Sequence, residues 1–165
     1  MATTKFKGND VHTQGALPVV GEKAPDFTLV AQDLSEKNLA SFAGKKKVLN
    51  IFPSIDTGVC ATSVRQFNVK AAGKANVVVV NISADLPFAM KRFCAAEGIE
   101  NVVNLSSFRS PDFGKTWGTL MTDGGLKGLH ARSVVIVDEH DKVVHVELVP
   151  EIAQEPNYDA ALSTL

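Results

Sequence analysis

The sequence predicts a three-layer α/β sandwich whose sheet has a parallel portion and an antiparallel edge. Three observations indicate this class. Short apolar runs rich in β-branched residues alternate with segments of helical periodicity over residues 47–105. The run at 77–82 is interpreted as apolar throughout, as in a central strand that helices cover on both faces. Ser133–Val137 and Lys142–Val149 flank a polar turn at 138–141, which predicts a β-hairpin near the end of the chain.

The amino-terminal quarter contains the less regular elements. Residues 3–14 alternate in polarity around Gly8, Asn9 and Asp10, which predicts a small hairpin. An irregular stretch follows, punctuated by proline and glycine. Phe27–Val30 is then a predicted strand.

The centre of the chain alternates between strands and helices. Residues 47–52 form a predicted buried strand that ends at Pro53, because proline offers no amide to a ladder. A helix is expected over about 59–73, and another over 87–97 that begins at a proline. The remaining predicted elements are a strand at 102–105, a short helix at 111–117 and a closing helix at 157–165. No repeat or linker divides the chain, so residues 1–165 are expected to form one domain.

Composition excludes several functional classes. Hydrophobic residues make up 45% and charged residues 21% of the chain, and the formal net charge is -1. This balance is typical of a globular protein and argues against nucleic acid or an anionic membrane as the main partner. Lys45–Lys47 is the only basic run, and we expect it to lie in a solvated turn. Met1–Lys7 has no apolar signal core and no segment is apolar enough to span a bilayer, so a cytoplasmic location is expected.

Cys60 is the leading candidate for a reactive group. It lies just beyond a predicted strand, in the first turn of a predicted helix, where free amide hydrogens and the helix dipole favour a thiolate. Active sites of open α/β sheets also gather at the carboxyl ends of strands. The alternative is a small buried hydrophobe, the usual environment of a free cysteine. In the cytoplasm, two cysteines are more often catalytic or redox-active than structural.

The second cysteine, Cys94, lies in the predicted helix at 87–97. On a helical wheel Ala89, Phe93 and Ala96 share the most apolar side, and Cys94 is off its centre. The two cysteines are too far apart in sequence for a Cys-x-x-Cys pair. With four scattered histidines they show no zinc-ligand spacing either, so no metal site is predicted.

Other polar and aromatic residues are assigned structural roles. Asp85 is expected to cap the helix that begins at Pro87. His130 is the only histidine near a proposed active-site residue, and a structural role is favoured for it. The glycine-rich segment 123–128 lacks the Gly-Lys-Ser/Thr of a phosphate loop, so a surface loop is expected. Phe113 and Trp117 are expected in the core or at an interface.

Two motifs carry a resemblance to a known family. Pro53, Thr57 and Cys60 form Pro-x-x-x-Thr-x-x-Cys, which resembles the active-site motif of peroxiredoxins. Residues 83–94 resemble the corresponding segment of one peroxiredoxin branch, the bacterial thiol peroxidases. The similarity also includes residues 50–60, 126–129 and Arg132, and it extends over essentially the whole chain. It implies a thioredoxin-like fold with an added amino-terminal hairpin at about 3–14.

The resemblance also implies a role for each residue. Cys60 would be the peroxidatic cysteine, oxidised to a sulfenic acid, and Cys94 the resolving cysteine that forms a Cys60–Cys94 disulfide. Thr57 would hydrogen-bond the thiolate and the peroxide. Pro53 would shield the sulfenic acid from water. Arg132 would hold the thiolate and polarise the peroxide through its planar set of donors.

The implied activity is thioredoxin-dependent reduction of hydrogen peroxide and organic hydroperoxides, with alkyl hydroperoxides favoured, as protection against oxidative stress. No cofactor or metal is implied. A homodimer is also implied, for which Phe108, Arg109 and residues 111–117 are the candidate surface. Two alternatives remain: a redox switch that uses the disulfide to control a partner, and a purely structural disulfide. Turnover over many cycles distinguishes an enzyme from a switch, and ready reduction by thioredoxin excludes a structural bond.

Overall fold

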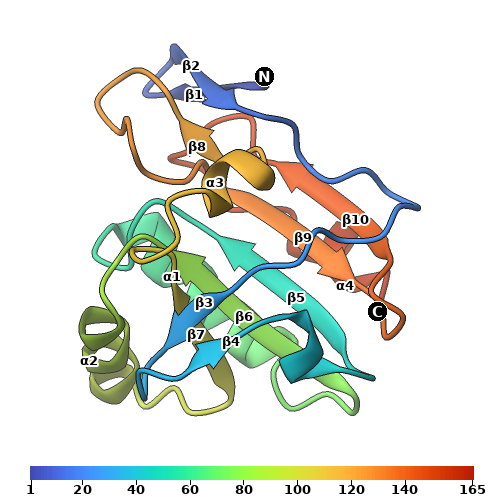
Figure 1. Ribbon diagram of the computed structural model, residues 1–165. Coiled ribbons are helices and arrows are strands. Elements are labelled where there is room, and N and C mark those ends of the chain that lie inside the picture. Colours follow the sequence, from blue (N-terminus) through green and yellow to red (C-terminus); the bar gives the residue numbers. More distant parts are fainter.

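The computed structural model describes residues 1–165, and its seven-stranded sheet lies between two layers of helices and loops (Figure 1). The sheet order is β10-β9-β5-β6-β7-β3-β4, so β6 is the middle strand, as predicted for the run at 77–82. In this order the strands are β10 (Val143–Leu148), β9 (Ser133–Val137), β5 (Lys46–Ile51), β6 (Val77–Ser83), β7 (Val102–Ser106), β3 (Leu29–Ala31) and β4 (Glu36–Lys37).

The sheet is parallel at its centre and antiparallel on both sides. β5, β6 and β7 pair in parallel, whereas β9 pairs antiparallel with β5, and β3 antiparallel with β7. The sequence predicted one antiparallel edge; β3 and β4 supply a second. The parallel strands all end toward the same edge, and that edge receives the loops that lead into α1 and α2.

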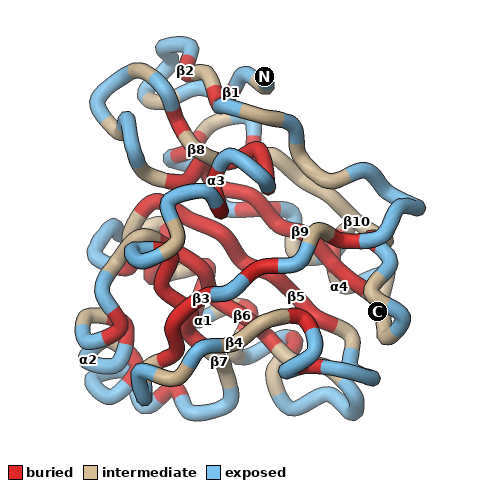
Figure 2. Tube along the Cα trace, viewed as in Figure 1, coloured by how far each residue is buried: buried red, intermediate tan, exposed pale blue.

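Helices cover both faces of the sheet. They are α1 (Gly58–Lys70), α2 (Pro87–Glu97), α3 (Phe113–Thr116), α4 (Tyr158–Leu162) and the 3-10 helix η1 (Leu39–Phe42). Figure 1 shows α3 in front of the sheet and α1 and α4 behind it. Phe67 of α1 and Ala161 of α4 pack on β5, β6 and β9, while Phe113 and Trp117 pack on the opposite face. The central strands are therefore buried along most of their length (Figure 2), and the three-layer prediction is confirmed.

A second, three-stranded sheet closes one end of the molecule. It consists of β1 (Thr3–Phe6), β2 (Asn9–Gln14) and β8 (Leu120–Met121), in the order β1-β2-β8. The hairpin turn falls on Lys7 and Gly8, whose φ angles of 52° and 84° suit a tight turn between twisted strands. The predicted hairpin at 3–14 is thus present and is extended by β8. This sheet carries Phe6 toward the carboxyl end of β5.

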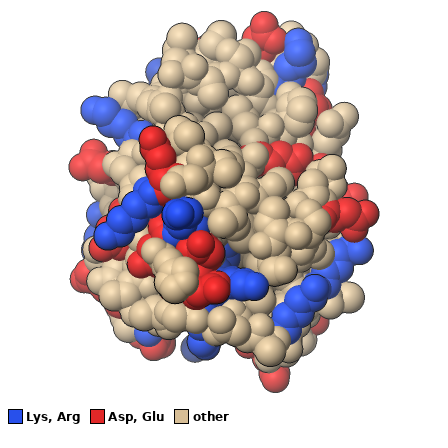
Figure 3. Space-filling view, turned by 90° about the vertical axis from the view of Figure 1, so that its right-hand side faces the viewer, with Lys and Arg blue, Asp and Glu red and all other residues tan.

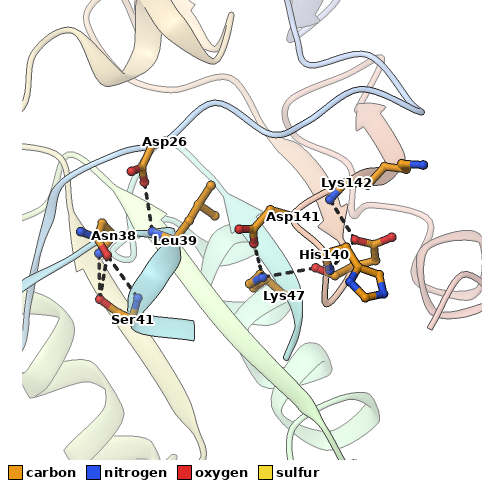
Figure 4. A network of polar contacts seen from close by, with 9 residues as sticks. Asp26, Asn38, Leu39, Ser41, Lys47, His140, Asp141 and Lys142 are labelled. Atoms are coloured by element: carbon orange, nitrogen blue, oxygen red, sulfur yellow. Dashed lines mark hydrogen bonds and ion pairs between the residues drawn. The ribbon is translucent and has the colours of Figure 1, made fainter. Parts of the chain in front are cut away.

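The prediction that residues 45–47 form a solvated turn is wrong for Lys47. It lies within β5, its side chain is fully buried, and its ammonium pairs with Asp141 and donates to the Asp138 carbonyl oxygen (Figure 4). Asp141 has a φ of 64°, which the hairpin turn between β9 and β10 requires. The same view shows the capping box of η1, in which Asn38 and Ser41 exchange hydrogen bonds. A buried ammonium is tolerated because its hydrogen-bonding groups find partners.

Charges on the surface are mixed in sign. On the face drawn in Figure 3, lysine and arginine side chains lie among aspartate and glutamate side chains. This distribution agrees with the formal net charge of -1. None of the helices combines the length and the apolar character that crossing a membrane requires.

Candidate active site

The loop between β5 and α1 positions Cys60. Asp85 holds this loop, because its carboxylate accepts hydrogen bonds from Ser54 Oγ at 2.8 Å and from the Ile55 amide at 2.7 Å. Ser83 Oγ, at the end of β6, donates to the same carboxylate at 2.6 Å. The prediction that Asp85 caps α2 is therefore wrong: the N-cap of α2 is Leu86, and Asp85 instead ties the end of β6 to the loop before α1.

Thr57 is the N-cap residue of α1, and its side chain makes no capping hydrogen bond. Its hydroxyl donates instead to the Ser54 carbonyl oxygen at 3.0 Å. The lone pairs of Thr57 Oγ1 therefore stay available to accept a hydrogen bond from a molecule above the helix start. Cys60 follows in the first turn of α1, as the sequence predicted.

Arg132 reaches the sulfur of Cys60 from the start of β9. Its Nη2 donates to Cys60 Sγ at 3.1 Å, and its Nε donates to the Ile152 carbonyl oxygen at 2.8 Å. The third nitrogen, Nη1, is buried and has no hydrogen-bond partner within the protein. A guanidinium hydrogen bond favours the thiolate form of a cysteine. The arrangement thus sets a cationic donor against the sulfur of Cys60 and leaves one further donor unused beside it.

A hollow of about 150 Å³ lies over these residues. Its lining includes three of the predicted site residues, namely Pro53, Thr57 and Arg132. Cys60 itself has no exposed surface. The rest of the lining is mainly apolar and comes from distant parts of the chain: Phe6, Gly58, Val59, Leu126, Ile152 and Ala153. The structure therefore places Pro53 and Thr57 with Arg132 around one hollow, and Cys60 beside it.

Cys94 lies on the buried face of α2. That face consists of Pro87, Met90 and Cys94, whereas Ala96 is exposed. The prediction that the apolar side of this helix is centred on Ala89, Phe93 and Ala96 is therefore wrong. The reason is that α2 packs against α1 and against Val102 and Asn104 of β7, and not on the middle strand of the sheet. Cys60 and Cys94 belong to one apolar cluster, and both are free thiols. The cluster also contains Phe52, Ile55, Val64, Met90 and Ile99.

The sulfur of Cys94 has a partner of its own. Asn104 Nδ2, on β7, donates to Cys94 Sγ at 3.0 Å. Burial raises the pKa of the Cys94 thiol, and the Asn104 hydrogen bond opposes part of that rise. The thiol form is therefore favoured while Cys94 stays in this position.

Sequence reasoning missed two groups of residues near the cysteines. One is the apolar lining from Phe6 and Ile152, which no local pattern could associate with Cys60, together with Leu126, which the resemblance included without giving it a role. The other is a row of buried asparagines on the central strands, Asn50, Asn81 and Asn104. The available signal was an asparagine inside each of three strands that are otherwise largely apolar.

His130 lies outside the hollow and is buried. Ser107 Oγ lies 2.7 Å from its Nε2 and Thr119 Oγ1 lies 3.0 Å from its Nδ1. Burial lowers the pKa of His130 to about 4. A neutral imidazole between two hydroxyls, packed edge-on to Phe113, has a structural role, as the sequence analysis favoured. No group of three or more histidine, cysteine or carboxylate side chains is placed to hold a metal ion.

Comparison with known proteins independently identifies the family and the fold of this chain. The family model described as Redoxin matches residues 19–162. A thiol peroxidase of Corynebacterium glutamicum is 56% identical over 165 residues, covering 100% of this chain and 99% of the relative. A crystal structure of a peroxiredoxin-like protein from Aquifex aeolicus superposes with a TM-score of 0.92 at 44% identity, covering 99% of this chain and 95% of that one. A thiol peroxidase from Chromobacterium violaceum, with a TM-score of 0.87 and 22% identity over 98% and 93% of the two chains, shares the fold.

Proposed function

Because the chain belongs to the redoxin family and is a thiol-dependent peroxidase, we propose that Cys60 is its peroxidatic cysteine and Cys94 its resolving cysteine. The observation that carries this assignment is the hydrogen bond from Arg132 Nη2 to Cys60 Sγ at 3.1 Å. Of the two cysteines, only Cys60 has a sulfur that contacts a cationic group. Cys94 instead has a raised pKa, which suits a thiol that reacts second.

The first step is attack by the Cys60 thiolate on the terminal oxygen of a hydroperoxide. An S–O bond forms and the O–O bond breaks; the sulfur is oxidised to a sulfenic acid and the peroxide is reduced. The leaving alkoxide or hydroxide takes up a proton and departs as alcohol or water. The unpaired Nη1 of Arg132 supports this step, because a preorganised donor stabilises negative charge that develops on the departing oxygen. Thr57 lines the hollow and spends its hydroxyl hydrogen on the Ser54 carbonyl oxygen, which supports Oγ1 as the acceptor of the peroxide O–H.

Pro53 contributes by position. It is buried at the end of β5 and lines the same hollow, where it limits the access of water to an oxidised Cys60. The sulfenic acid then meets the thiolate of Cys94. An S–S bond forms, the S–O bond breaks, and the hydroxide that leaves takes up a proton to become water.

Two electrons and two protons then restore the thiols. We propose a cytoplasmic thioredoxin as the donor, attacking the Cys60–Cys94 disulfide with its own thiolate.

The apolar lining from Phe6, Val59, Leu126 and Ile152 supports organic hydroperoxides as substrates in addition to hydrogen peroxide. A second copy of the chain is proposed to cover the exposed side chains of Leu86, Phe88 and Phe108.

Steady-state turnover tests the proposal. Purified protein is mixed with NADPH, thioredoxin reductase, thioredoxin and either hydrogen peroxide or cumene hydroperoxide. Oxidation of NADPH over many equivalents per protein chain is expected, and only when all components are present. Oxidation that stops after one equivalent would contradict an enzyme and indicate a redox switch instead.

A further inference from the structure

The three buried asparagines form a row across the centre of the sheet. Asn50 on β5 is the register partner of Asn81 on β6, which is in turn the register partner of Asn104 on β7. All three lie on the face of the sheet that α1 and α2 cover, because each is two residues from an apolar side chain of that face. The row therefore extends beneath both helices that carry the cysteines.

At one end, the row reaches the backbone of Cys60. Ser63 Oγ donates to the Cys60 carbonyl oxygen at 2.8 Å, so the Ser63 oxygen is free to accept. Asn50 Nδ2 donates to that oxygen at 3.2 Å and, with its second hydrogen, to Asn81 Oδ1 at 3.1 Å. In this orientation each asparagine of the row donates to the next, and Asn50 Oδ1 is left buried without a partner.

At the other end, the row reaches the sulfur of Cys94. Asn81 Nδ2 donates to Asn104 Oδ1 at 3.0 Å, which leaves Asn104 Nδ2 facing Cys94 Sγ at 3.0 Å. The direction of donation is therefore the same along the whole row and ends with a donor on sulfur. Buried polar groups of this kind are costly when one member loses its partner, so the row holds Asn104 in a defined orientation.

The two sulfurs are held by different strands. Cys60 Sγ is bound by Arg132, which directly precedes β9, and Cys94 Sγ by Asn104 of β7. Both cysteines are free thiols in one apolar cluster, and each sulfur has a donor of its own. A disulfide requires the two sulfurs to be bonded at about 2.05 Å. Formation of that bond moves Cys94 Sγ toward Cys60 and away from the strand that carries Asn104.

We propose that Asn104 is a positioning residue that retains the Cys94 thiol against the sheet, and that breaking its hydrogen bond to Cys94 is part of the barrier to disulfide formation. This inference rests on the proposed roles of the two cysteines. It concerns only the second step, in which Cys94 displaces hydroxide from the Cys60 sulfenic acid. Asn104 thereby lengthens the life of the sulfenic acid without affecting peroxide attack.

Rapid-quench mass spectrometry after one equivalent of peroxide separates the two steps. In Asn104→Val, the Cys60 sulfenic acid is expected to form at the wild-type rate and to convert to the disulfide about 2- to 12-fold faster, the range that one net hydrogen bond supports. Val102→Ala is the matched control: Val102 is also on β7, two residues away, and packs against the same helices without a polar contact to sulfur. An unchanged or slower rate in Asn104→Val, or an equal gain in Val102→Ala, would overturn the proposal.

A second readout does not depend on peroxide chemistry. In a Cys60→Ser background, ultraviolet absorbance of the thiolate reports the pKa of Cys94. Removing the donor should raise that pKa in Asn104→Val and leave it unchanged in Val102→Ala. If Asn104→Val does not fold, Asn104→Ala also removes the donor to sulfur, and it should raise the Cys94 pKa and speed disulfide formation as Asn104→Val does. A Cys94 pKa that neither variant moves contradicts the proposal.

The two proposals fail in different ways. If wild-type protein forms no Cys60–Cys94 disulfide with peroxide, the assignment of the cysteines is wrong. If wild-type protein forms it and Asn104→Val behaves like Val102→Ala in both readouts, only the role of Asn104 is wrong.

Discussion

Arg132 Nη2 and Cys60 Sγ lie 3.1 Å apart although the two residues are 72 positions apart in sequence. The contact joins the start of β9 to the first turn of α1, and both residues are buried. Arg132 is held from its other side by the Ile152 carbonyl oxygen at 2.8 Å. The guanidinium is therefore fixed in place before any peroxide arrives, which is the condition for electrostatic stabilisation of a transition state.

Replacement of Arg132 should slow peroxide attack. Arg132→Leu removes both the donor to sulfur and the unused Nη1, and loss of such a donor typically lowers the rate about 10²- to 10³-fold. Stopped-flow oxidation of Cys60 measures the step, with circular dichroism as the control for folding. The rate of Cys60 oxidation in Arg132→Lys should fall between those of wild type and Arg132→Leu, because one ammonium cannot reproduce the planar set of donors. A folded Arg132→Leu variant with near-normal kcat/KM would remove Arg132 from the active site.

The apolar lining of the hollow should set the preference among hydroperoxides. Phe6→Ala removes a large apolar side chain contributed by β1, far from Cys60 in sequence. We expect kcat/KM for cumene hydroperoxide to fall about three- to tenfold, because less apolar surface of the substrate is buried. Hydrogen peroxide serves as the internal control, since it has no apolar group to bury. An equal loss for both substrates would show that Phe6 acts on the fold and not on substrate binding.

His130 should make stability depend on pH in the acid range. Its folded-state pKa of about 4 lies below the usual 6.5, so the unfolded chain binds the proton more readily between these values. The stabilisation is complete above pH 6.5 and is lost as the pH falls toward 4, by about 3 kcal/mol in total. Urea unfolding between pH 6.5 and 4 should show that the free energy of unfolding falls less in His130→Gln than in wild type. Parallel curves for the two proteins would contradict a buried neutral His130.

The exposed aromatic patch should mediate self-association. Phe108 is 70% exposed and Phe88 is 62% exposed, and both lie beside Leu86. Sedimentation of wild-type protein at micromolar concentration should give twice 17.6 kDa, and Phe108→Glu should give the monomer. Val69→Glu is the control, because Val69 is 78% exposed, more than either phenylalanine, but lies on α1 outside this patch. A wild-type species near 17.6 kDa would rule out the dimer.

Local sequence patterns predicted most of the fold. The bounds of α2 agree with the prediction for 87–97, because a proline start and a glycine end mark it clearly. The strands β4 and β8 were missed because two residues carry no periodicity. Trp117 and Phe113 belong to the core, which was one of the two positions expected for them, so these two residues of the expected dimer surface at 111–117 are not part of any surface.

Contacts between distant segments account for what the sequence did not predict. Lys47 is buried because Asp141, on another strand connection, reaches its ammonium. Asn81 was overlooked within a run interpreted as wholly apolar, since its partners lie on two other strands. The orientation of Cys94 was misjudged because a helical wheel does not show which side of α2 the sheet occupies.

Mass spectrometry after one equivalent of hydroperoxide tests the assignment of the two cysteines most directly. In wild-type protein, we expect a disulfide between the peptides that contain Cys60 and Cys94. In Cys94→Ser, the Cys60 peptide should gain one oxygen atom, trapped by a sulfenic-acid reagent, and turnover with thioredoxin should cease. In Cys60→Ser, peroxide should leave Cys94 unmodified on the same timescale. Oxidation of Cys94 in the Cys60→Ser variant, together with an unmodified Cys60 in Cys94→Ser, would contradict the account.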